Sequence, residues 1–253
     1  MEPAELEMLR AIFAAPNRDE PRLAYAAWLE AQGQPERAEF IRIQCCGGDR
    51  RREEELLAAH GAAWRAAFLP AGLENPPLAF QRGFPCVRPS LQYYRYQDGE
   101  GLSACTLALA GSPYLLGCRR LSLGYSTWLS DQAARALAES PFACHLEELE
   151  LHEVVVAPAE LEALAALPAM SHLILIGGCS VDAGGQECVF PSLSLEGLRR
   201  LAGSSRVNLR KITLANQDLD QAAIQPLLES PNLANLTIVV LDYGNRQQGE
   251  WLR

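Results

Sequence analysis

Positive charge is scarce in this sequence. The chain of 253 residues contains 22 Lys and Arg against 31 Asp and Glu, which gives a formal net charge of −9. Proteins that wrap nucleic acid or bind anionic lipid do so through Lys and Arg that displace counterions from phosphates. The one basic run, Arg50–Arg52, is followed at once by Glu53–Glu55, so we expect solvated ion pairs rather than an anion site there. The composition therefore disfavours nucleic acid and membranes as partners.

Long apolar runs and export signals are missing as well. No stretch approaches the roughly 18 consecutive apolar residues of a membrane span, and the first residues, MEPAELEM, lack the basic and apolar regions of a secretory signal. We therefore expect a cytoplasmic protein. The eight cysteines are then reduced, and because they contain no C-x-x-C pair we interpret them as structural thiols.

The common signatures of catalysis are absent from the sequence. It has no G-x-x-x-x-G-K-[ST] loop, no H-E-x-x-H helix and no G-x-S-x-G turn. The glycine pairs Gly177–Gly178 and Gly184–Gly185 fit a flexible loop better than a phosphate cradle. The sequence predicts no cofactor and a non-enzymatic protein.

Four helical patterns occupy the first 70 residues. Pro21 and Pro35 suit the first turns of two helices, Asp19 suits an N-cap, and Gly33 suits the break between them. Trp28 and Trp64 are expected in the core of a small bundle rather than on a ligand platform. The helices are expected over residues 5–15, 19–32, 35–45 and 53–68.

A helix, a Gly-containing turn and a second helix also describe a DNA-binding motif. In this chain the second helix would begin with Glu36 and would carry Glu39 one turn later. Both carboxylates would then meet phosphates across the groove, so we disfavour this interpretation.

One stretch of the helical region resembles a known family. Residues 22–30 read RLAYAAWLE, and residues 35–45, after Gly33, read PERAEFIRIQC. This is similar to the bacterial repeat-companion domain, whose pattern runs approximately R-L-x-Y-A-D-W-L-E, a short G-D-P turn and R-A-E-F-I-R-L-Q. The likeness covers about residues 5–70, with Ala27 and Gln34 where the family usually has Asp. It implies a helical domain without enzymatic activity that precedes leucine-rich repeats.

A register L-x-x-L-x-L recurs in the second half of the chain. Its middle positions are separated by 28, 24, 39 and 24 residues, mostly in or near the range of about 20–29 residues of leucine-rich repeats. The longest interval holds a Gly-rich insertion near residues 177–191. Helical patterns lie between the registers, over residues 131–139, 159–166, 195–202 and 220–229. The five middle positions are Leu121, Leu149, Leu173, Ile212 and Leu236.

These patterns predict an α/β fold. We expect a short leucine-rich repeat solenoid over residues 71–253, with parallel strands on the concave face and helices on the convex face. It follows an all-α helical domain over residues 1–70. Residues 78–87, LAFQRGFPCV, resemble the strand that often joins the companion domain to the first repeat, and we expect a degenerate first repeat there. At the other end, Trp251 and Leu252 either fold back as a cap or stay mobile.

Polar and aliphatic residues between the leucines are expected to line the concave face in rows, because side chains alternate along a strand. The row before the middle leucine reads Arg120, Glu148, His172, Lys211 and Asn235. The next row reads Ser122, Glu150, Ile174, Thr213 and Thr237. The row after the last leucine reads Gly124, His152, Ile176, Ala215 and Val239.

Three interpretations of the charged residues stay open. Arg120, Glu148, His172 and Lys211 can form a cross-strand ladder of ion pairs, which we favour, or can serve as binding contacts. Alternatively, a metal-binding or hydrolytic site uses Glu148, Glu150, His152 and His172. We expect a monomer that binds another protein with a basic and partly apolar surface. The candidate partner-binding residues are Tyr125, Glu148, Glu150, His152, His172, Ile174, Ile176, Lys211 and Val239.

Overall fold

The computed structural model divides into two units. The helical unit comprises Met1–Arg88 and Ser112–Gly117, and the sheet unit comprises Pro89–Gly111 and Cys118–Arg253. The residues that the structure describes are 1–67, 79–85, 90–93, 99–124, 128–181, 187–190, 193–217, 219, 221–242 and 247–252.

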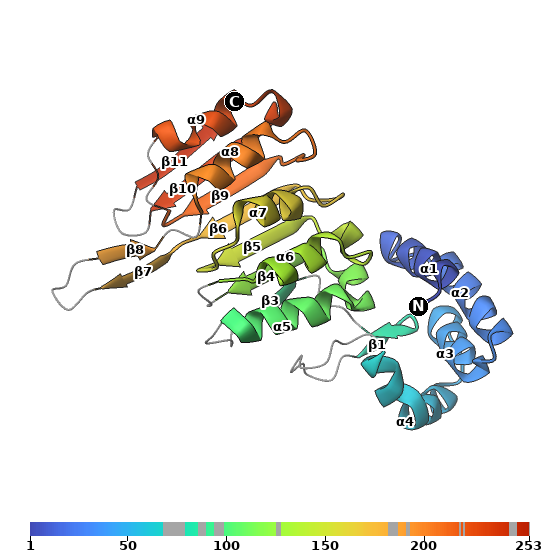
Figure 1. The fold of residues 1–253 in the computed structure, drawn as a ribbon. Helices are drawn as coiled ribbons and strands as arrows, with labels where there is room; N and C mark the ends of the chain where they lie inside the picture. Colours follow the sequence, from blue (N-terminus) through green and yellow to red (C-terminus); the bar gives the residue numbers. More distant parts are fainter. Residues whose placement is uncertain are drawn as a thin grey trace. The chain divides into compact units, whose positions relative to one another are not determined.

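Four helices form most of the helical unit (Figure 1): α1 Pro3–Ala14, α2 Glu20–Ala31, α3 Pro35–Cys46 and α4 Arg50–Ala66. The first three have proline in the first turn, where its missing N–H breaks no hydrogen bond. The fourth begins after Asp49, whose carboxylate accepts a hydrogen bond from the backbone N of Arg51 at 2.9 Å. The four helices expected from the sequence are confirmed, with ends that differ by a few residues.

The predicted role of Asp19 as an N-cap is wrong. Its side chain makes no capping hydrogen bond to α2. The carboxylate instead accepts from the guanidinium of Arg82, with Oδ1 at 2.9 Å from Nε and 2.6 Å from the nearer terminal nitrogen. Both partners of this pair are charged, whereas a capping bond to a backbone N–H has only one charged partner. It also holds the pKa of Asp19 below its usual value.

Residues 80–85 form a tight hairpin and not the single strand that we expected. Strand β1 (Phe80–Gln81) pairs antiparallel with β2 (Phe84–Pro85) through a turn at Arg82 and Gly83. Gly83 has a φ of +86°, and a Cβ there would lie 2.6 Å from the side chain of Ile41 on α3. Gln44 accepts a hydrogen bond from the Gly83 backbone N at 2.6 Å. The hairpin therefore belongs to the packing of the helical unit.

Aromatic side chains gather in the core of the helical unit. Tyr25 stacks on Trp28 with ring centroids 5.7 Å apart, and the fully buried Phe40 lies 5.0 Å from Trp64. The sequence predicted both tryptophans in the core, and the structure has them half-buried at its edge, in contact with buried rings. On α4 the buried leucine is Leu56.

A seven-stranded sheet forms the centre of the sheet unit (Figure 1). Six of its strands are joined by parallel pairing, which confirms the α/β fold, and β11 pairs antiparallel with β10. The C-terminal tail thus folds back onto the last parallel strand. In spatial order the strands are β11 Gln247–Leu252, β10 Thr237–Asp242, β9 Lys211–Ala215, β6 His172–Ile176, β5 Glu148–His152, β4 Arg120–Gly124 and β3 Ser90–Tyr93.

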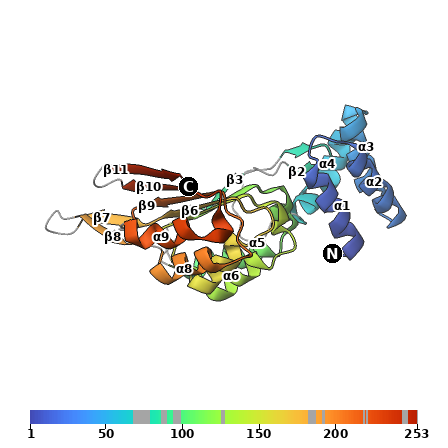
Figure 2. The ribbon, with the colours of Figure 1, turned by 90° about the horizontal axis from the view of Figure 1, so that it is seen from above.

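Helices cover one face of this sheet (Figure 2). Ser130 and Ser194 cap two of them by accepting hydrogen bonds from Ala133 N at 3.2 Å and Gly197 N at 3.1 Å. The described helices with their bounds are α5 Gly99–Ala110, α6 Asp131–Ala138, α7 Pro158–Ala165, α8 Leu195–Gly203 and α9 Gln221–Glu229. The last four confirm the helices that we expected. In the described ranges of both units, no helix is long and apolar enough to cross a membrane.

The core lies between the sheet and these helices. Leu121, Leu149, Leu173, Ile212 and Ile238 are aligned across five strands, and each is at most 1% exposed. On β5 and β6, buried residues alternate with half-buried ones, as a sheet with one covered face requires.

Two details of the strands differ from expectation. The insertion near residues 177–191 contains an antiparallel hairpin of β7 (Gly178–Val181) and β8 (Glu187–Phe190), where we expected only a flexible loop. On β10, Ile238 and not Leu236 lies beside Ile212. The last register is therefore shifted by two residues.

Candidate binding surface on the sheet

The face of the sheet opposite the helices carries the predicted site residues. We call it the open face, and we define it by residues whose side chains alternate with the buried leucines. On β4 these are Arg120, Ser122 and Gly124, and on β5 Glu148, Glu150 and His152. On β6 they are His172, Ile174 and Ile176, and on β9 Lys211, Thr213 and Ala215. On β10 they are Thr237 and Val239.

The register brings these residues into rows. Glu148 pairs with Arg120 on one side and with His172 on the other, as expected, and Glu150 pairs with Ser122 and Ile174. Because of the two-residue shift, Val239 lies beside Thr213 in the middle row. Asn235, Thr237 and Val239 are therefore misplaced in the predicted rows, and Tyr125 lies outside the described residues.

A hydrogen-bonded chain crosses three strands at the first row. Glu148 Oε2 lies 3.0 Å from Nδ1 of His172, whose Nε2 lies 3.0 Å from Thr213 Oγ1. Arg120 Nε is 4.0 Å from the same carboxylate oxygen. With a neutral imidazole, Nδ1–H donates to Glu148 and Nε2 accepts from the Thr213 hydroxyl. Three of the four predicted members of the ladder, Arg120, Glu148 and His172, are thus neighbours, but His172 joins through hydrogen bonds and not as an ion pair, and Thr213 is a partner that sequence reasoning missed.

Burial sets the charge state of His172. Desolvation lowers its pKa below the usual value, although the hydrogen bond to Glu148 acts in the opposite direction. The nearby cations Lys211 and Arg120 add to the lowering. The burial and the two cations together outweigh the carboxylate, so His172 is neutral at neutral pH.

The titration of His172 should be visible in the stability of the protein. Because the folded pKa is below the unfolded value of about 6.5, the unfolded chain binds the proton more readily, and stability falls as the pH drops through that value. We expect the melting temperature of His172→Gln to depend less on pH between 7.5 and 5 than that of the wild type. A matched His60→Gln variant serves as the control. Equal slopes for wild type and His172→Gln would contradict this assignment.

The side chains proposed for a metal or hydrolytic site do not converge. Glu148 and His172 bond to each other, and His152 lies 3.9 Å from Glu153. Glu150 has no ion pair or hydrogen bond within the described ranges. In that part of the chain, no group of three or more His, Cys, Asp or Glu side chains is arranged to hold a metal ion.

Cys45 is also a poor nucleophile. Cys45, Cys46, Cys105, Cys118 and Cys144 are thiols and not disulfides. Burial, together with Asp19, raises the pKa of Cys45 to about 11, which keeps that thiol protonated at neutral pH.

The basic run behaves as the sequence predicted. Arg50 pairs with Glu54 and Arg51 with Glu55, each at 3.3 Å, and Arg52 pairs with Glu39 at 2.8 Å. The three arginines of this stretch are therefore paired with carboxylates and do not form an open anion site.

Comparison of the chain with protein-family models, curated proteins and solved structures gives no match. The open face must therefore be interpreted from its own chemistry. Its middle row places the carboxylate of Glu150 beside the half-buried Ile174, with Thr213 and Val239 further along. An anionic group beside aliphatic surface suits a cationic side chain with an apolar stem.

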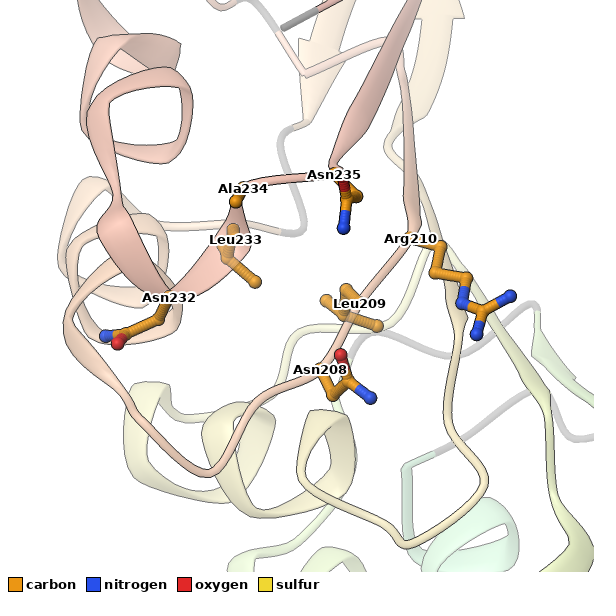
Figure 3. A pocket seen from close by; sticks show the side chains of 7 residues that line it. All are labelled: Asn208, Leu209, Arg210, Asn232, Leu233, Ala234 and Asn235. Atoms are coloured by element: carbon orange, nitrogen blue, oxygen red, sulfur yellow. The ribbon is translucent and has the colours of Figure 1, made fainter.

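Two features escaped sequence reasoning. Trp128 and Val155 form a bridge beyond the carboxyl ends of β4 and β5, and they are 46% and 48% exposed. A hollow of about 360 Å³ also opens where the chain runs into β9 and β10 (Figure 3). No signal in the sequence indicated the hollow, because Leu233-x-x-Leu236-x-Ile238 keeps the spacing of the earlier registers and only the pairing of Thr237 with Lys211 reveals the two extra residues.

Proposed function

We propose that this chain is a non-enzymatic interaction protein, in which a helical domain similar to the repeat-companion domain accompanies leucine-rich repeats. The open face of the sheet is its binding surface for another protein. One support is the set of L-x-x-L-x-L registers, whose inner residues align on β4, β5, β6 and β9. A second is that, along the chain, a helix lies between β4 and β5, between β5 and β6, and between β6 and β9.

The observation that carries the proposal is the state of Glu150. Its carboxylate has no partner among the described side chains, whereas Glu148 bonds to His172 and Glu147 pairs with Arg119 at 2.9 Å. A partner with a basic and partly apolar surface would pair with this carboxylate and cover Ile174 and Ile176. The exposed Trp128 offers an aromatic contact at the edge, where the sequence suggested Tyr125.

Substitutions on the open face should weaken partner binding. We expect Glu150→Lys to slow association and to alter its dependence on salt, because it reverses the charge that attracts a basic partner. Ile176→Asp should cost about 2 kcal/mol, or roughly 30-fold in Kd, since it places a charge in a desolvated contact. Glu139→Lys makes the same charge change just after α6, on an exposed side chain of the helical layer, and should have no effect.

The measurement begins with capture of partners from an extract of the source organism on the full-length chain, followed by binding kinetics with the purified partner. A protein retained by wild type and Glu139→Lys, but lost from Glu150→Lys and Ile176→Asp, supports the proposal. Equal retention by all four chains would place the interface elsewhere.

A further inference from the structure

The hollow beside β9 and β10 arises from a longer connection. Each of the strands β4, β5, β6 and β9 begins two residues after a buried apolar residue; β9, for example, begins at Lys211, two residues after the buried Leu209. At β10 the strand begins at Thr237, four residues after the buried Leu233. Ala234 and Asn235 are the extra residues. They separate the segment that leads into β10 from the segment that leads into β9. The hollow is lined by Asn208, Leu209, Arg210, Asn232, Leu233, Ala234 and Asn235.

Two carboxamides face each other across this hollow. Figure 3 shows Asn208 and Asn235 pointing toward one another from the two connections, with Leu209 between them and Leu233 to one side, whereas Asn232 points away. Asn232 donates to the backbone O of Gly203 at 3.4 Å. The side chains of Asn208 and Asn235 have no hydrogen-bond partner in the described part of the chain. Each offers an acceptor oxygen and two donor hydrogens, so the pair suits a group that both donates and accepts, such as an amide.

Arg210 adds a positive charge at the rim. Its backbone is held, because its N donates to Ser171 O and its O accepts from Thr237 N, both at 2.9 Å. Its guanidinium is exposed and has no ion pair among the residues that the structure describes. In Figure 3 it extends outward from the edge of the hollow. A guanidinium on a flexible side chain presents several N–H donors in one plane, and it can bind a carboxylate that lies just outside the two carboxamides.

From this arrangement we infer that the hollow binds the carboxy-terminal residue of a peptide. The amide of that residue lies between Asn208 and Asn235, and its terminal carboxylate pairs with Arg210. A volume of about 360 Å³ is at the small end of ligand sites, which fits one or two residues and not a larger ligand. A single guanidinium without a second cation favours a singly charged carboxylate over a phosphate. The inference does not depend on the function proposed for the open face.

The test uses the full-length protein and a pair of small probes. The first probe, Nα-acetyl-glycylglycine, carries peptide amides and a terminal carboxylate. The second probe is the same compound with its carboxylate converted to a carboxamide, which removes the negative charge. In NMR titrations we expect the acid to shift the side-chain amide signals of Asn208 and Asn235, with a Kd of about 1 mM. The amide probe should bind at least ~10-fold more weakly, because the charge-assisted bonds to Arg210 are lost.

Variants assign the two contacts separately. Arg210→Gln should bind the acid and the amide probe with similar affinity. The double variant Asn208→Ala/Asn235→Ala should bind both probes more weakly, and by about the same factor. Arg206→Gln removes an exposed guanidinium four residues away, outside the hollow, and should bind like wild type. Equal affinity of wild type for acid and amide, shifts confined to other residues, or inorganic phosphate binding in place of the acid would each overturn the inference. The probe comparison on wild type needs no variant to fold.

Discussion

Replacing Arg37 with alanine should destabilise the helical unit by about 3 kcal/mol. The Arg37 side chain is only 7% exposed, and its guanidinium lies among four aromatic rings. The guanidinium carbon is 4.8 Å from the centroid of Trp64, 5.5 Å from that of Phe84, and 5.6 Å from those of Phe40 and Phe80. Alanine would leave a cavity between these rings and would remove their attraction to the cation.

The charge of Arg37 also holds the hairpin. A terminal nitrogen donates to the backbone O of Gly83 at 2.5 Å, so α3 and the β1–β2 turn are joined through this side chain. Burial lowers the pKa of Arg37 to about 10, which leaves the group charged at neutral pH. Without it the Gly83 carbonyl loses a partner inside the unit, which adds a desolvation cost to the loss of packing.

Chemical denaturation and hydrogen exchange of α3 and the hairpin would measure this effect. Arg42→Ala is the matched control on the same helix, because Arg42 is exposed and only pairs with Glu30 at 2.5 Å. It should cost at most about 0.5 kcal/mol. Arg37→Met should recover part of the alanine loss, since it refills the cavity without restoring the hydrogen bond. Similar stability of Arg37→Ala and Arg42→Ala would show that the aromatic cluster does not depend on the cation.

A second large effect is expected on β6. Leu173→Ala should lower the stability of the sheet unit by about 3 kcal/mol, because Leu173 is fully buried between Leu149 and Ile212 under the helices. Ile174→Ala, one residue along the same strand, removes less buried apolar surface, since Ile174 is half-buried on the open face. Its cost should be at most about 1 kcal/mol.

Urea denaturation of the two variants compares the faces of the sheet directly. Both substitutions shorten an aliphatic side chain on the same strand. The difference in unfolding free energy between the two variants therefore reports which face of the sheet each residue occupies. If both variants lost the same stability, Ile174 would be covered as fully as Leu173, and the open face would be unavailable to a partner.

Sequence reasoning located the candidate surface in part. Glu148, Glu150, His172, Ile174 and Lys211 lie on the same face and in the expected neighbourhood, because strand periodicity alone assigns faces. Periodicity could not reveal the hydrogen bond from the Thr213 hydroxyl to His172, which joins positions 41 residues apart in different rows. Nor could it show that Glu150 would be the carboxylate left without a partner among the described residues.

The sequence by itself determined the four helices of the helical unit, the helices α6 to α9, and the strands β4, β5, β6 and β9 with the side of each strand that faces the core. These signals are local, because apolar residues recur with the period of one element and prolines and caps mark its ends. Only the tertiary structure decided how distant segments meet: the bond of Asp19 to Arg82, the hairpin at Gly83, and the register of β10. The register shows the physical reason most clearly. A shift of one residue would turn the apolar side outward, but a shift of two keeps the same face buried, so the hydrophobic pattern cannot distinguish the two alignments.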